Sequence, residues 1–142
     1  MPEEEKMKIL IVGAGGREHA IAWKLSQNKD VEKIFIAPGN AGAELIEIAE
    51  NVELKGIQEY IEFAKENGID LTIVGSEELL VQGIVDEFKN NGLKIFGPDK
   101  KAAVLEGSKA YSKDFMKKYG IKTAVYEIVD NSEKAKEFLT NW

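Results

Sequence analysis

The residues most suited to chemistry are the glycine-rich run Gly13-Ala14-Gly15-Gly16 and the arginine that follows it, Arg17. They come directly after an all-apolar stretch, Ile9 to Val12, and directly before a helix-forming one. At such a junction α/β folds hold phosphate, because glycines let an anion reach backbone N–H groups. The Arg17 guanidinium adds a planar, permanent positive charge. The alternative is a tight strand-to-helix turn that binds nothing.

A dinucleotide site is the main rival, and the G-x-G-x-x-G pattern tests it. Gly13 and Gly15 fit this pattern, but Glu18 stands at the third glycine position, where a missing side chain normally allows close helix–strand packing. The next predicted strand, Lys33 to Ala37, ends in Pro38-Gly39-Asn40-Ala41-Gly42 and not in the acid that binds a ribose. A second glycine loop with an asparagine favours a sugar or phosphate contact over NAD.

His19 and Arg17 each have a second interpretation. His19 is the only histidine and lies in the first turn of the predicted helix, whose positive dipole end disfavours an imidazolium. We therefore expect a neutral, hydrogen-bonding imidazole and no acid catalysis. For Arg17, an ion pair with Glu18 or Glu77 is the alternative to an anionic ligand.

Composition excludes several classes of protein. The chain has 142 residues, enough to bury a core, and a net charge of −6, which disfavours nonspecific binding to nucleic acid or to anionic membranes. It has no cysteine, which excludes disulfides, a thiolate nucleophile and cysteine-liganded zinc. No apolar run approaches the roughly 20 residues of a membrane span. We expect a cytoplasmic protein with a disordered leader at residues 1–7.

Strands and helices alternate along the chain, which predicts a parallel sheet covered by helices. The expected strands are Lys8–Val12, Lys33–Ala37, a short third one at Val52–Leu54, Leu71–Val74 and Leu93–Phe96, and the expected helices are Arg17–Asn28, Ile57–Asn67 and Glu77–Asn91. These elements form one doubly wound domain over residues 8–98. Ligands bind such sheets where the carboxyl ends of the strands meet.

A different pattern follows Pro98. Helices are expected at Asp99–Leu105, Ser108–Tyr119 and Ser132–Asn141, with a strand at Thr123–Val129. That strand has no second strand to pair with, so residues 99–142 are interpreted as linker helices and the incomplete start of a second domain. The alternative is a helical cap packed on the first sheet.

Five blocks of sequence, in order, resemble the glycinamide ribonucleotide synthetases, a family of the ATP-grasp superfamily. They are Gly13-Ala14-Gly15-Gly16-Arg17-Glu18-His19-Ala20, Ala37-Pro38-Gly39-Asn40-Ala41-Gly42, Asp70-Leu71-Thr72-Ile73-Val74-Gly75, Phe96-Gly97-Pro98 and Leu105-Glu106-Gly107-Ser108-Lys109. The resemblance covers nearly everything from Lys8 onward and ends before the glycine-rich ATP loop and the metal-binding carboxylates of that family. It implies an α/β fold: a Rossmann-like pre-ATP-grasp domain followed by the truncated start of an ATP-grasp domain.

One block departs from the family pattern. Where the family usually has Gly-Pro-Glu-Ala-Pro-Leu-Val, this chain has Gly75-Ser76-Glu77-Glu78-Leu79-Leu80-Val81. Both prolines are replaced, and Ser76 is a competent helix N-cap. Glu77 is kept, and it resembles an acid that meets the sugar hydroxyls or the amine of the substrate in related enzymes.

The resemblance implies an ATP-dependent ligation of glycine to 5-phosphoribosylamine in purine synthesis, with ATP and Mg²⁺ or Mn²⁺ acting in the full-length enzyme. The substrate-binding residues that it implies are Gly15, Gly16, Arg17, Pro38, Gly39, Asn40, Gly42 and Glu77, and Lys109 would approach the ATP phosphates. The resemblance also implies that no residue of this chain acts as a general base or nucleophile, because positioning and charge neutralisation carry such reactions. On this interpretation the missing ATP-grasp domain is the intramolecular partner.

Three classes of function stay open on the sequence. The first is this ligase fragment, inactive by itself, and the second is a nicotinamide-dependent domain. The third is a stand-alone module that binds a sugar phosphate or nucleotide. Within the first class, biotin carboxylases and carboxyaminoimidazole nucleotide synthetases share the pre-grasp architecture. The Pro-Gly-Asn-Ala-Gly and Glu-Gly-Ser-Lys blocks favour glycine ligation.

Overall fold

The structure is a computed structural model that describes residues 6–141. Within it the chain divides into two units, one that extends to Ala103 and one that begins at Val104. The predicted leader at residues 1–7 is wrong at its end, because Met7 already opens the first strand. Residues 1–5 of that prediction lie outside the described part.

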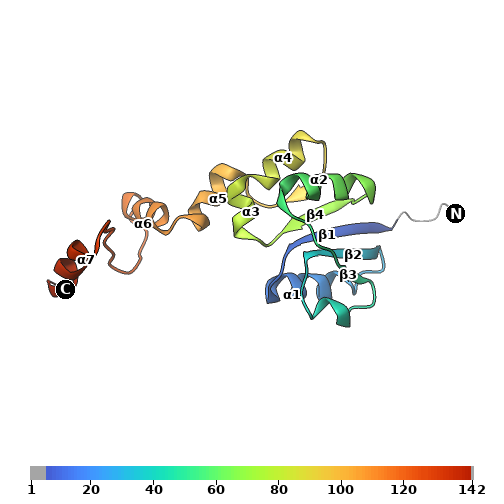
Figure 1. Ribbon diagram of the computed structural model, residues 1–142, viewed down its shortest axis with the longest axis horizontal. Coiled ribbons are helices and arrows are strands. Elements are labelled where there is room, and N and C mark those ends of the chain that lie inside the picture. Colours follow the sequence, from blue (N-terminus) through green and yellow to red (C-terminus); the bar gives the residue numbers. More distant parts are fainter. Residues whose placement is uncertain (1–5, 142) are drawn as a thin grey trace. The chain divides into compact units, whose positions relative to one another are not determined.

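A parallel sheet forms the first unit, as the sequence predicts. Its order is β3-β2-β1-β4-β5, and each pair of neighbours is parallel (Figure 1). The strands are β1 (Met7–Gly13), β2 (Val31–Pro38), β3 (Ala49–Asn51), β4 (Leu71–Val74) and β5 (Ile95–Phe96). The central strand β1 therefore has β2 on one side and β4 on the other.

Helices cover both faces of this sheet. The helix α1 (Gly16–Leu25) and the 3-10 turn η1 (Ala43–Leu45) pack on one face, and α2 (Gly56–Glu66), α3 (Glu77–Gln82) and α4 (Ile84–Asn90) pack on the other (Figure 1). A further helix, α5 (Lys100–Gly107), contains the point where the two units divide.

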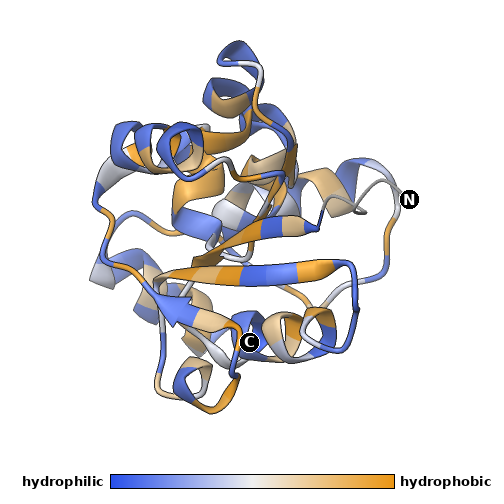
Figure 2. Ribbon diagram, turned by 90° about the vertical axis from the view of Figure 1, so that its right-hand side faces the viewer, coloured by the Kyte–Doolittle hydropathy of each residue, from blue (hydrophilic) through white to orange (hydrophobic). Residues whose placement is uncertain are grey.

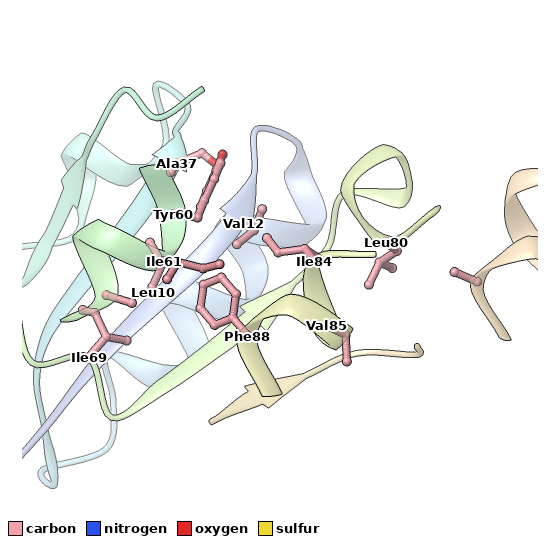
Figure 3. Packing of buried hydrophobic residues seen from close by; sticks show 12 residues of the cluster. Leu10, Val12, Ala37, Tyr60, Ile61, Ile69, Leu80, Ile84, Val85 and Phe88 are labelled. Atoms are coloured by element: carbon pink, nitrogen blue, oxygen red, sulfur yellow. The ribbon is translucent and has the colours of Figure 1, made fainter. Parts of the chain in front are cut away.

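The core consists of two layers, separated by β1. Leu10 and Val12 pack into the layer under α2 and α4, whereas Ile9 and Ile11 pack into the layer under α1. All four are at most 1% exposed, which is why this strand reads as a continuous apolar run. Figure 2 shows apolar residues along the strands. Figure 3 shows Phe88 in the middle of the core layer that contains Leu10 and Val12.

Two predicted elements of the first unit are corrected. The third strand is Ala49–Asn51 and not Val52–Leu54, because the residues that pair with β2 are Ala49–Asn51; Val52 and Leu54 follow the strand and pack against the core. The helix predicted over Glu77–Asn91 is broken into α3 and α4 at Gly83, whose φ of 102° is left-handed. A single helix cannot pass through that conformation, and glycine adopts it without a steric penalty.

The second unit contains α6 (Lys109–Lys118) and α7 (Ser132–Thr140), each with a side-chain N-cap. The predicted strand Thr123–Val129 is wrong, because these residues have no regular structure. The described residues of the second unit contain no strand with which it could pair, and Val125 and Ile128 are exposed. Among the helices described, none has the length and apolar character needed to cross a membrane.

Truncation of Phe88 tests the core. Phe88 is fully buried, so Phe88→Ala should lower the free energy of unfolding by about 3 to 5 kcal/mol. The matched control is Phe96→Ala, whose ring is 70% exposed and whose loss should cost less than about 1 kcal/mol. Urea unfolding followed by circular dichroism measures both. Equal losses in the two variants would contradict the packing described here.

Ionisation of the Tyr60 hydroxyl should lower the stability of the fold at alkaline pH. Burial raises the pKa of its hydroxyl, and the Glu59 carboxylate raises it further. The fold therefore favours the neutral phenol, and this contribution is complete below the unfolded pKa of about 10 and disappears as pH rises through the folded pKa. As the pH rises from about 10 to 11, the stability of Tyr60→Phe should fall less steeply than that of the wild type. Tyr119→Phe is the control, because the Tyr119 ring is 60% exposed, and its stability should follow that of the wild type. Parallel curves of stability against pH for all three proteins would contradict the role given to Tyr60.

Candidate functional site

The register of the sheet brings three turns to one edge. Gly13 at the end of β1 lies beside Pro38 at the end of β2, and Val12 lies beside Val74 at the end of β4. The Val12 carbonyl accepts hydrogen bonds from the N–H groups of both Gly75 and Ser76, at 2.9 and 3.2 Å. The loops after β1, β2 and β4 therefore start from neighbouring points, which is the usual ligand-binding position in an open α/β sheet.

A cavity of about 520 Å³ opens between these turns. Of the residues predicted to bind substrate, Gly15, Gly16, Arg17, Pro38 and Glu77 line it. Gly39, Asn40 and Gly42 do not line it and belong to the loop behind Pro38. The remaining lining comes from the rest of the first turn, the start of α2 and the start of α3: Val12, Gly13, Ala14, Glu18, Leu54, Gly56, Tyr60, Gly75, Ser76, Glu78, Leu79 and Gln82.

Arg17 and Glu77, which are sixty residues apart in sequence, form an ion pair in this cavity. The Arg17 Nη2 atom lies 2.6 Å from Glu77 Oε1 and also donates to the Gly75 carbonyl at 3.0 Å. Of the two partners considered from the sequence, Glu77 is therefore the one that pairs with Arg17. The Arg17 side chain is 61% exposed and that of Glu77 is 44% exposed, so the pair stabilises the fold by about 1 kcal/mol at most.

Two helix starts give the cavity a positive and a negative side. The positive side is the first turn of α1, where Arg17 adds its charge to backbone N–H groups that have no intrahelical acceptor, although the buried Glu18 carboxylate in the same turn already accepts the Gly15 N–H. The negative side is the first turn of α3, which carries the carboxylates Glu77 and Glu78. Such a cavity suits a ligand that has an anionic group at one end and hydroxyl or amine donors at the other.

The loop after β2 is held by asparagine side chains. Asn51, on β3, accepts from the Asn40 N–H at 3.1 Å and donates to the Asn40 carbonyl at 2.9 Å. The Asn40 side chain accepts from the Ala43 N–H and donates, at 3.4 Å, to the Gly15 carbonyl. Asn40 therefore joins the two glycine loops. Asn51 carries no motif that would have identified this role in the sequence.

Glu18, Tyr60 and His19 also act on the two loops. Glu18 is 3% exposed, and its Oε2 atom accepts the Gly15 N–H at 2.6 Å. The Tyr60 hydroxyl donates to the Ala37 carbonyl at 3.2 Å. The His19 ring lies against Gly42, where a Cβ would be 2.6 Å from His19 Nδ1. Glutamate at the third position of a helix is the signal that could have identified Glu18 as a cap.

Lys109 lies in the second unit as the first residue of α6. The Ser108 hydroxyl caps this helix by accepting the Tyr111 N–H at 3.2 Å, so the capping turn expected before Lys109 is present. Lys109 itself is exposed. Across residues 6–141, histidine and acidic side chains form no group of three that could hold a metal ion.

Comparisons with known proteins agree with these features. Residues 7–106 match the family described as phosphoribosylglycinamide synthetase, N domain, and residues 107–142 match the ATP-grasp (A) domain of the same synthetase. The chain is 61% identical over 133 residues to the phosphoribosylamine–glycine ligase of Clostridium acetobutylicum and to that of Fusobacterium nucleatum. These matches cover 94% of this chain but 32% and 31% of the relatives, so the chain spans about a third of their length.

Two solved structures share the fold of this chain, and one of them comes from the same family of ligases. The crystal structure of the phosphoribosylamine–glycine ligase of Thermotoga maritima matches 96% of this chain and 31% of its own, at 32% identity and a TM-score of 0.64. The N5-carboxyaminoimidazole ribonucleotide synthetase of the same organism shares the fold, with 22% identity and a TM-score of 0.61 over 93% of this chain and 36% of its own. On the family match over residues 7–106 and the fold that it shares, the chain belongs to the phosphoribosylglycinamide synthetase family.

Proposed function

We propose that this chain is the substrate-binding N-terminal part of a phosphoribosylamine–glycine ligase, and that its cavity holds the phosphoribosyl group of 5-phosphoribosylamine. The main support for this proposal is the charge of the residues that line the cavity. The start of α1 and Arg17 provide positive charge, and Glu77, which Arg17 contacts, provides negative charge. A 5-phosphate is a dianion that suits the first side, and ribose hydroxyls or an amine are donors that suit a carboxylate.

The phosphate would replace Glu77 as the partner of Arg17. Because the ion pair is exposed and contributes little stability, an anion that also meets α1 amides competes for the guanidinium at small cost. Release of Arg17 leaves the Glu77 carboxylate available to accept from the sugar or the amine. The pair thus holds both side chains at the cavity before the ligand arrives.

The rest of the reaction is proposed for a longer protein. ATP would phosphorylate the glycine carboxylate, and the amine of phosphoribosylamine would attack the acyl phosphate to give glycinamide ribonucleotide, ADP and phosphate. Lys109, at the start of the ATP-grasp match, would approach the ATP phosphates. The metal ion, Mg²⁺ or Mn²⁺, would be bound by carboxylates of the ATP-grasp domain of that longer protein, as the family resemblance implies.

As in the sequence prediction, we assign the phosphoribosylamine-binding domain to residues 8–98, and linker helices with the incomplete start of an ATP-grasp domain to residues 99–142. Gly39, Asn40 and Gly42 act in it by placing Pro38 and the Gly15 turn, through the hydrogen bonds of Asn40. We also propose, as expected from the sequence, that the protein is cytoplasmic and that its partners are small molecules.

Calorimetric titration with glycinamide ribonucleotide tests the role of Arg17. Arg17→Ala should weaken binding about tenfold or more, because it removes a charge-assisted hydrogen bond to the phosphate. Lys24→Ala is the matched control, since Lys24 is an exposed cation in the last turn of the same helix. ATP in a parallel titration should show no dependence on Arg17. Equal affinities of wild type and Arg17→Ala would reject the phosphate site.

Glu77→Gln should change the affinities for two ligands in opposite directions. Loss of the carboxylate frees Arg17, so inorganic phosphate should bind severalfold more tightly, whereas glycinamide ribonucleotide loses a charged acceptor and should bind about tenfold more weakly. Glu66→Gln is the matched control, because it removes the same charge from an exposed residue in the last turn of α2, outside the cavity, and it should leave both affinities within about twofold. If Glu77→Gln weakens both ligands equally, Glu77 does not meet the sugar end.

A further inference from the structure

Glu18 is a buried carboxylate that packs against the backbone of three glycines. A Cβ on Gly13 would lie 2.7 Å from Glu18 Cδ, one on Gly15 would lie 3.0 Å from Oε2, and one on Gly75 would collide with Oε1. These three residues come from the end of β1, the first turn and the end of β4. The Glu18 side chain therefore occupies the space between two strand ends and the start of α1.

This arrangement replaces the third glycine of the dinucleotide pattern. In that pattern a glycine on the helix allows the helix to approach the strand closely. Here the helix carries the side chain, and Gly13, at the end of β1, and Gly75, directly after β4, leave room for it. The close approach survives, but a carboxylate now lies beneath the turn.

The carboxylate also uses a donor that a ligand anion would need. Glu18 Oε2 accepts the Gly15 N–H at 2.6 Å, so the turn already holds an anion that belongs to the chain itself. A pyrophosphate placed on this turn would compete with Glu18 for the Gly15 N–H and would lie close to its negative charge at low solvent exposure. The N–H groups further into the first turn of α1 stay clear of this contact.

Capping of α1 at the Gly15 N–H accounts for one oxygen of the Glu18 carboxylate but not for the burial of the other. The Glu18 Oε1 atom is buried and has no hydrogen-bond partner among the described residues. A buried acceptor without a donor costs stability, and a buried charge costs more. The single hydrogen bond to Gly15 does not offset the free energy lost by burying the second oxygen. This imbalance points to a role of Glu18 in ligand selection.

We infer that Glu18 is a specificity-determining residue of the cavity. Its carboxylate occupies the anion position at Gly15 and thereby excludes the pyrophosphate of a dinucleotide. A single phosphoryl group is directed to the next amides of α1 and to Arg17. This inference deepens the proposed function, on which it rests for the nature of the accepted ligand.

The experiment measures ADP-ribose and ribose 5-phosphate binding to the 142-residue chain and to Glu18→Gln by calorimetry. Glutamine keeps the shape and an oxygen for the Gly15 N–H but removes the charge. The affinity for ADP-ribose should rise at least tenfold, about 1.4 kcal/mol, while that for ribose 5-phosphate should change less than about threefold. The matched control is Glu66→Gln, an exposed glutamate in the last turn of α2, which should change neither affinity.

The two proposals fail in different ways. If wild type does not bind ribose 5-phosphate but Glu18→Gln gains ADP-ribose, the proposed ligand is wrong and the role of Glu18 stands. If Glu18→Gln folds, as judged by its unfolding temperature, and binds ADP-ribose no better than wild type, the role of Glu18 is overturned.

A second measurement needs no variant and covers the case in which Glu18→Gln does not fold. In amide NMR spectra of the wild type titrated with ribose 5-phosphate, the Gly16 resonance should shift and the Gly15 resonance should stay in place, because Glu18 already holds the Gly15 N–H. A largest shift at Gly15 would show that the phosphate displaces the carboxylate and would overturn the inference. The absence of any shift in the turn would overturn both proposals.

Discussion

Burial of β1 on both faces and pairing on both edges is the constraint on which the rest of the structure depends. Alternate side chains of this strand belong to separate core layers, so neither layer forms without it. Its parallel register with β2 and β4 fixes where three loops begin. The shared acceptor at Val12 then draws the Gly75 turn against the Gly13 turn. The cavity is thus a product of sheet register more than of any one loop.

Polar groups at this edge are largely satisfied by one another. Arg17 pairs with Glu77, Asn40 with Asn51, and Gly15 with Glu18. These contacts differ in burial, and burial determines how strongly each one contributes and how easily it is broken. The exposed Arg17–Glu77 pair adds about 1 kcal/mol at most, whereas the buried Glu18 carboxylate is shielded from water and depends on the Gly15 N–H. One edge of the sheet therefore carries one carboxylate that can change partner at small cost and another that cannot.

Sequence patterns with a strong physical cause predicted the structure best. The apolar run of β1 and the glycine turns gave the parallel α/β fold and the edge where Arg17 and Glu77 meet. Local patterns failed where a single backbone angle or a missing neighbour decides, as at Gly83 and at Thr123–Val129. The Asn51 contact was beyond prediction, since it depends on the pairing of β3 with β2, which no local signal reports.

The asparagine contacts behind Pro38 have a consequence for the entropy of ligand binding. The Asn40 side chain has both its oxygen and its nitrogen engaged, and its backbone is held from β3. A loop ordered in advance loses little conformational freedom when a ligand arrives, whereas ordering a mobile side chain costs about 0.5 to 1.5 kcal/mol. Preorganisation of this kind lowers the entropic cost of binding at the neighbouring cavity, and it matters most for a small ligand, which has few atoms to contact.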